Sequence, residues 1–231
     1  MAKTRFPGFP LELLHFLDEL SRHNNREWFQ ANRPRYEQAL LEPALAFIEA
    51  MTEPLEKISP HFCAIPKRSG GSLMRIYRDV RFGKNKRPYK TNVGIQFRHE
   101  AGRDVHAPGF YFHISIDEAF LGVGIWRPDS QALGKIRRAI DNHSADWKNV
   151  CQNRTFRKRF ERRGESLKRP PRSYSADHPL LNDLRRKDHI AIYPLEHDTL
   201  LTPSIVPETA RGYRTGRTYM QFLCDALGLK F

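Results

Sequence analysis

The feature that most constrains this fold is the alternation of apolar and polar residues in the middle of the chain. Apolar side chains occupy every second position in three consecutive segments, residues 93–97, 110–116 and 121–125. Successive side chains of a β-strand point to opposite faces, so this period predicts strands with one apolar face and one polar face. The links between the segments are short, as antiparallel strands allow. The sequence therefore predicts an antiparallel meander.

A fourth strand is predicted just before these three, within residues 72–82, and a basic loop over residues 83–90 joins it to its neighbour. The alternation also predicts the register, because a slip of one residue would move every side chain to the other face. We expect Val80 opposite Val93 and Ile76 opposite Phe97 in the first pairing, and Ile116 opposite Ala119 in the last.

Helical periodicity is present on both sides of the predicted sheet. Leucines spaced three residues apart follow Pro10 and predict an amphipathic helix over residues 11–20, and a second amphipathic pattern covers residues 219–229. We therefore predict one α+β domain, residues 1–231. In it, an antiparallel meander of about four strands, roughly residues 72–126, is flanked by N- and C-terminal helices.

Local signals predict where several helices begin. Asn24, followed three residues later by Glu27, resembles a capping box at the start of a short helix. Asp129 or Ser130 suits the cap of a later helix, and Ser144 suits the cap of the next one.

The composition favours an acidic partner. The 231 residues carry a formal net charge of +13, which is typical of proteins that associate with nucleic acid, anionic lipid or phosphorylated ligands. No apolar run approaches the roughly 20 residues of a membrane span, and the N-terminus lacks the pattern of a secretory signal. The three cysteines lack paired spacing, which argues against a disulfide framework and predicts a cytoplasmic protein.

The polar face of the predicted sheet, with the basic loop beside it, is the leading candidate for a ligand-binding site. We expect its cations to hold an anionic, phosphate-bearing ligand through charge-assisted hydrogen bonds, and its other polar groups to orient that ligand. The proposed residues are Arg75, Tyr77, Arg81, Lys86, Arg87, Lys90, Asn92, Gln96, Arg98, Tyr111 and His113.

Three glycines, Gly94, Gly122 and Gly124, also fall on the polar face. Glycine within a strand is unfavourable unless something approaches the backbone closely. The approaching group could be a ligand, an aromatic ring from a neighbouring strand or a packed helix, and the sequence leaves all three open.

Several other functions remain open. Asp104, His106 and His113 could form an open metal site in a metal-assisted hydrolase, although their spacing matches no known metal motif. The basic stretch Arg154–Arg172 could follow a nucleic-acid backbone, or the polar face could be a protein interface. No dinucleotide or nucleophile-elbow pattern stands in a suitable context, so the leading prediction includes no cofactor and no metal, and whether the chain is an enzyme stays open.

Four segments together resemble a bacterial family catalogued as domain of unknown function 2461. They are FPGFPLELLHFLDELSRHNNREWFQANRPRYE, GGSLMRIYRDVRFGKNKRPYKTNVGIQFRH, DVHAPGFYFHI and GIWRPD. The resemblance covers nearly the whole chain and implies a stand-alone cytoplasmic domain of similar length. It brings no assigned activity and no catalytic residue.

Overall fold

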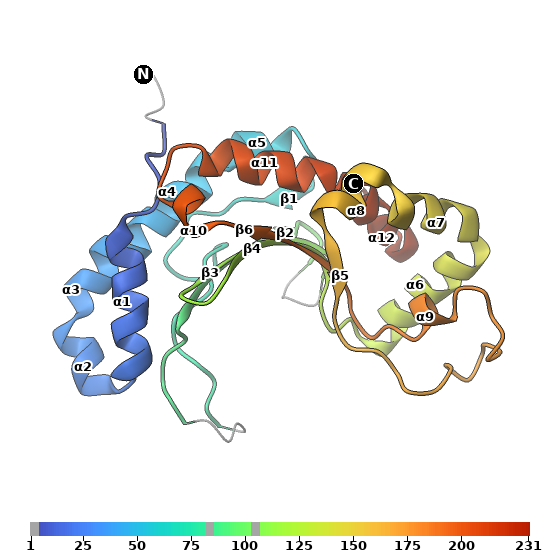
Figure 1. Cartoon of the computed structure of the whole chain (residues 1–231), viewed down its shortest axis with the longest axis horizontal. Helices are drawn as coiled ribbons and strands as arrows, with labels where there is room; N and C mark the ends of the chain where they lie inside the picture. Colours follow the sequence, from blue (N-terminus) through green and yellow to red (C-terminus); the bar gives the residue numbers. More distant parts are fainter. Residues whose placement is uncertain (1–4, 82–85, 103–106) are drawn as a thin grey trace.

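The computed structural model describes residues 5–81, 86–102 and 107–231. Its centre is an antiparallel sheet with the strand order β1-β2-β3-β4-β6-β5 (Figure 1). The strands are β1 Phe62–Cys63, β2 Asn92–His99, β3 Gly109–Ser115, β4 Ala119–Ile125, β5 Glu161–Arg163 and β6 His189–Leu195. The α+β class and the antiparallel meander are confirmed. The sheet has six strands instead of about four, because the C-terminal half of the chain adds two and residues 62–63 add a third.

Along the chain, helices both precede and follow the strands β2 to β4, as predicted. They are α1 Leu11–Arg22, α2 Arg26–Ala31, α3 Arg33–Tyr36, the π-helix η1 Glu37–Leu41, α4 Glu42–Ala50, α5 Thr52–Glu56, α6 Ser130–Asn142, α7 Ser144–Gln152, α8 Arg154–Arg159, α9 Leu181–Leu184, α10 His197–Leu200, α11 Ile205–Thr215 and α12 Arg217–Leu227. Among the described residues, no helix combines the length and the apolar character that a membrane span requires.

Two of the predicted helix caps are wrong and one is confirmed. Asp129 caps α6 by accepting a hydrogen bond from the backbone of the third helical residue. Helix α2 is capped by Asn25 and not by Asn24, whose side chain bonds elsewhere. Ser144 is the first residue of α7, and its N-cap, His143, makes no side-chain cap bond.

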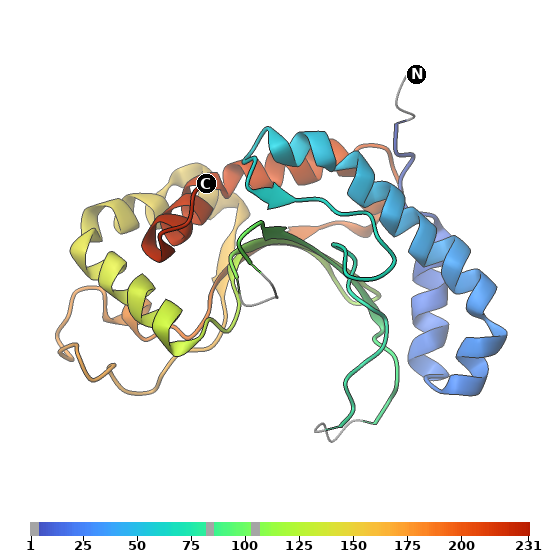
Figure 2. The ribbon, with the colours of Figure 1, turned by 180° about the vertical axis from the view of Figure 1, so that it is seen from behind.

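The core lies on one side of the sheet. The apolar positions of β2, β3 and β4 are buried there, and α4, α5 and α11 lie along the same side (Figures 1 and 2). In both views, no helix of the described chain crosses the opposite side of β2, β3 and β4. One face of the sheet is therefore packed by helices, and the other carries no helix of the described chain.

The register between β3 and β4 differs from the prediction by two residues. Ile114, and not Ile116, lies opposite Ala119. The predicted pairing would leave a loop of two residues, Asp117 and Glu118, and such loops need backbone conformations that favour glycine and asparagine. The observed loop is longer, and within it the Ser115 amide donates to the Glu118 carbonyl over 2.9 Å. A shift of two residues keeps every side chain on its predicted face.

The described part of the predicted strand, residues 72–81, forms no continuous strand. It runs antiparallel to residues 88–96 and is joined to them by two isolated bridges, Leu73 opposite Ile95 and Tyr77 opposite Tyr89, and by backbone hydrogen bonds such as that from the Lys90 amide to the Ile76 carbonyl. Between those bridges, four residue steps on one side match six on the other, so the pairing contains a bulge. The predicted pairs of Val80 with Val93 and Ile76 with Phe97 are therefore wrong. We call residues 72–81 and 86–91 the arm.

Candidate binding surface on the open face of the sheet

The open face is the side of β2, β3 and β4 that turns away from the core. The strand register aligns its residues in rows that run across the sheet. One row joins Gly94, His113 and Phe120, the next joins Gln96, Tyr111 and Gly122, and a third joins Arg98, Gly109 and Gly124. Of the predicted ligand-binding residues, Asn92, Gln96, Arg98, Tyr111 and His113 thus share one face.

The ring of Tyr111 lies across two of the glycines. A Cβ atom on Gly94 would lie 2.7 Å from the Tyr111 hydroxyl, and one on Gly122 would lie 3.2 Å from the Tyr111 Cβ. Side chains at these positions would lift the ring from the sheet. Of the three explanations that the sequence left open, the structure thus shows the cross-strand ring for Gly94 and Gly122.

Gly124 has a different explanation. Its φ of +126° is strained for any other residue, and an added Cβ would lie 2.0 Å from the carbonyl oxygen of His189 on β6. The backbone of the neighbouring strand therefore requires this glycine.

Tyr111 belongs to a patch of three rings, which we call the aromatic patch: Tyr111, His113 and Phe120. The rings of His113 and Phe120 are stacked, with centroids 4.6 Å apart and planes 9° apart. The Tyr111 centroid lies 6.0 Å from each of them, and its hydroxyl is 3.2 Å from His113 Nδ1.

The aromatic patch carries no charge at neutral pH. Burial lowers the pKa of His113, an effect that the nearby Glu118 opposes. Burial also raises the pKa of Tyr111 to about 12, and Glu118 adds to the rise. The imidazole is therefore neutral and the phenol protonated, so the patch offers flat, uncharged rings on a polar face.

Gln96 and Arg98 complete this face but are partly committed to the protein. Gln96 packs over Gly109 and is 8% exposed. Its Oε1 atom has no hydrogen-bond partner in the described part of the chain. Arg98 donates to the Gly71 carbonyl over 3.1 Å.

The arm carries the other predicted residues, and they do not line the sheet face as expected. Arg81 is bound to Asp79 at 2.7 Å, Lys86 donates to the Val80 carbonyl, and Arg87 donates to the Ser21 carbonyl. These cations are bound to other groups of the protein, and the arm that carries them extends away from the sheet (Figure 2).

Arg75 and Lys90 differ from Arg81, Lys86 and Arg87. Lys90 is half-buried, and desolvation lowers its pKa, with a further contribution from the neighbouring Arg75. Neither side chain makes a hydrogen bond or ion pair with any residue that the structure describes. Arg75 also helps to lower the pKa of Asp79, but the carboxylate of Asp79 is hydrogen-bonded to Arg81. Two adjacent cations thus lie at the base of the arm without an anion bound to them.

The base of the arm is fixed to the N-terminal helices. The side chain of Asn24 bonds both the amide and the carbonyl of Tyr89, each over 3.0 Å. The Tyr89 ring stacks on Phe29 of α2, with centroids 4.1 Å apart. Tyr77 adds an edge contact to Phe29 and remains 51% exposed. Arg75 and Lys90 are therefore held beside the start of β2.

An aromatic residue and a cation follow β4, at the end of the strands opposite to the base of the arm. Trp126 directly follows β4 and is 44% exposed, while its neighbour Ile125 is buried in the core. The Arg127 guanidinium lies 4.7 Å from the centre of the Trp126 ring. Arg127 has a φ of +48°, and its amide is held by the buried carboxylate of Asp188 over 2.8 Å.

Sequence reasoning missed Phe120, Trp126 and Arg127 as candidate residues. The alternation along residues 120–126 was a sufficient signal for the two rings, since it places them on the polar side of the strand. Neither ring carries a charge or an amide, the groups that typically bind anions.

The structure gives less support to the predicted metal site and to the basic stretch. Asp104 and His106 lie outside the described residues, and within the described ranges no group of three histidines, cysteines or acids is placed to hold a metal ion. In the basic stretch Arg154–Arg172, Arg159 is bound to Glu208 and Arg162 to Asp183. Part of that stretch therefore stabilises the protein itself.

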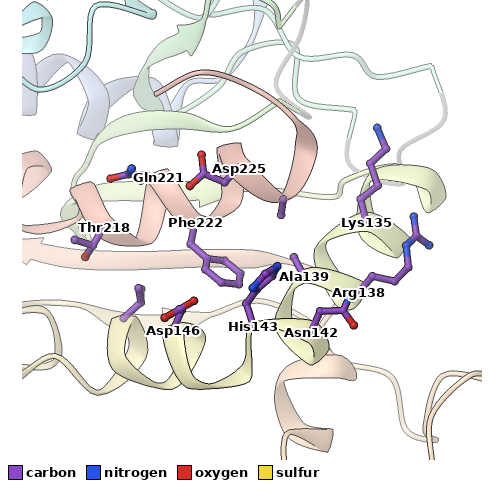
Figure 3. Close-up of a pocket in the computed structure, with 12 residues that line it drawn as sticks. Lys135, Arg138, Ala139, Asn142, His143, Asp146, Thr218, Gln221, Phe222 and Asp225 are labelled. Carbon is purple, nitrogen blue, oxygen red and sulfur yellow. The ribbon is translucent and has the colours of Figure 1, made fainter.

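A groove between α6, α7 and α12 has a volume of about 630 Å³ (Figure 3). His143 and Phe222 project into it, and its rim carries both signs of charge: Lys135, Arg138, Asp146 and Asp225. This mixture favours no one class of charged ligand.

Comparison with known proteins places the chain in a family without adding an activity. The family model described as "Conserved hypothetical protein (DUF2461)" matches residues 12–222. No curated protein and no solved structure matches the chain. Because the family model covers most of the sequence, the chain belongs to the family of conserved hypothetical proteins described by that model.

Proposed function

We propose that this protein binds a phosphate-bearing ligand where the base of the arm meets the open face. The observation that carries the proposal is the pair Arg75 and Lys90. Lys90 is half-buried beside a second cation, and no described acid is bound to either. Arg75 is exposed, but Lys90 is partly desolvated, and a like charge beside it adds to the free-energy cost of its charged form unless an anion neutralises the pair.

A phosphate group suits this position. Its oxygens accept charge-assisted hydrogen bonds from guanidinium and ammonium groups at once, and it would restore the pKa of Lys90 toward its ordinary value. Asn92, at the start of β2, follows Lys90 by two residues, and the row of Gly94, His113 and Phe120 begins two residues further along the strand. These groups would contact the rest of the ligand. The net charge of +13 adds a general attraction for anions.

The test is titration calorimetry with inorganic pyrophosphate. We expect Arg75→Ala combined with Lys90→Ala to weaken binding at least tenfold, since each charge-assisted hydrogen bond contributes about 1.5–3 kcal/mol. The matched control is Lys135→Ala combined with Arg138→Ala, which removes the same charge from exposed positions on α6. Equal affinities for the two double variants would rule the proposal out, because only net charge would then matter.

No observation favours the metal-assisted hydrolase over this binding function. Among the described residues, its one member is His113, whose ring is stacked on Phe120 and contacts the Tyr111 hydroxyl.

A further inference from the structure

We infer that the phosphate-bearing ligand is a single-stranded nucleic acid whose bases stack on the aromatic patch. This inference rests on the proposed function for the phosphate contact and adds the class of ligand. Three observations carry it: the flat rings, which are partly exposed, the separation of the cationic positions along the strands, and a sheet face that no helix of the described chain crosses.

The rings are arranged as a stacking surface. Gly94 and Gly122 leave room for the Tyr111 ring close to the sheet backbone, and the residue remains partly exposed. His113 and Phe120 form a parallel pair beside it. Proteins that bind single strands use such rings on an exposed sheet to stack unpaired bases, whatever the sequence of the strand.

The cations lie at opposite ends of the strands. Arg75 and Lys90 are near the start of β2, which pairs with the end of β3. Trp126 and Arg127 follow the end of β4, beside the row that contains Arg98. A seven-residue strand spans about 20 Å, which suits a strand of several nucleotides with a phosphate contact at each end and stacked bases between.

Other nucleic-acid ligands fit less well. A duplex keeps its bases stacked on each other and offers none to the rings, and a mononucleotide is too short to reach both cationic positions. A single strand satisfies both features, and its phosphates would make binding depend on salt.

The test uses fluorescence anisotropy with a labelled eight-nucleotide oligouridylate and a labelled duplex of equal length. Phe120→Leu removes one ring of the aromatic patch. We expect it to weaken binding of the single strand about 5- to 150-fold, the range that corresponds to the loss of one stacked base. The control is Phe222→Leu, which removes a half-buried ring from the distant α12 groove and should leave binding unchanged.

Pyrophosphate calorimetry on the same variants separates this inference from the proposed function. Phe120→Leu should bind pyrophosphate like the wild type, because it keeps Arg75 and Lys90. If the duplex binds as tightly as the single strand, or if Phe120→Leu and Phe222→Leu bind the oligonucleotide equally, the inference is wrong even where pyrophosphate binds. If Phe120→Leu weakens binding of the single strand but pyrophosphate affinity is unchanged by Arg75→Ala combined with Lys90→Ala, the inference stands and the proposed phosphate site is wrong.

Discussion

The stability of this protein should fall in mild acid because of one buried histidine. His189, at the start of β6, is fully buried, and neither of its ring nitrogens has a hydrogen-bond partner among the described residues. Burial lowers its pKa from 6.5 to about 3, and the nearby cations Arg186, Arg137 and Arg162 contribute to the shift. The folded protein therefore holds this ring neutral.

The sign of the effect follows from proton binding. Between pH 6.5 and pH 3 the ring binds a proton in the unfolded chain but not in the folded one, so the free energy of unfolding falls as the pH falls through that range. From pH 7 to pH 5 the loss is about 2 kcal/mol, since each pH unit below 6.5 contributes about 1.4 kcal/mol.

Urea unfolding of wild type and His189→Leu at pH 7 and pH 5 measures this loss. We expect the variant to be at least as stable as the wild type at pH 7, because it removes two unpaired buried nitrogens. At pH 5 the wild type should have lost about 2 kcal/mol more than the variant. His143→Leu, at an exposed position, serves as the control and should follow the wild type. Parallel pH dependence in wild type and His189→Leu would refute the reasoning.

Three further predictions concern the open face and its support. Gly94→Val should place a side chain under the Tyr111 ring, lower the free energy of unfolding by about 1–3 kcal/mol and weaken oligonucleotide binding. Gly134 lies inside α6, where only the flexible end of Arg138 is nearby, so Gly134→Ala should raise the free energy of unfolding by about 0.5–1 kcal/mol. Equal urea midpoints for these two variants would contradict the account. Asp188→Ala removes the acceptor of the Arg127 and Glu165 amides and should lower the free energy of unfolding in urea by about 2–4 kcal/mol. A decrease under about 0.5 kcal/mol, the range of ordinary surface substitutions, would show that these two hydrogen bonds contribute little to stability. Oligonucleotide affinity should be constant from pH 8 to pH 7 and rise below pH 6.5, because the pKa of His113 is lowered and its protonation adds a cation to the face. His113→Gln should abolish this rise, and an unchanged rise in the variant would show that another group causes it.

The sheet could be predicted from the sequence wherever a short-range pattern determines it. The period-two alternation located β2, β3 and β4 and assigned Tyr111 and His113 to the polar face correctly. The register of the β3–β4 hairpin was missed by two residues because it depends on the turn. There the Ser115 hydroxyl accepts from the Glu118 amide and donates to its carbonyl.

The arm shows where the pattern misleads. Alternating charge over residues 75–81 is typical of a strand with a solvent face, but it equally suits an extended segment that leaves the sheet. The decision depends on distant contacts, above all the bonds from Asn24 to Tyr89 and the stacking of Tyr89 on Phe29. No local pattern reports contacts between residues so far apart in the chain.

The candidate site was partly predictable for the same reason. The sequence placed Gln96, Tyr111 and His113 together and identified the glycines beneath the ring as unusual. It could not distinguish Arg75 and Lys90 from Arg81, Lys86 and Arg87, because that difference lies in which charges find a partner after folding.

The salt dependence of oligonucleotide binding tests the central claim most directly. If Arg75 and Lys90 each neutralise a phosphate, the slope of log affinity against log salt for the single strand should be smaller in magnitude by about 1.4 in the double alanine variant than in the wild type. The Lys135→Ala and Arg138→Ala control should keep the wild-type slope. An unchanged slope in the Arg75 and Lys90 variant would contradict the claim that the base of the arm holds the phosphates.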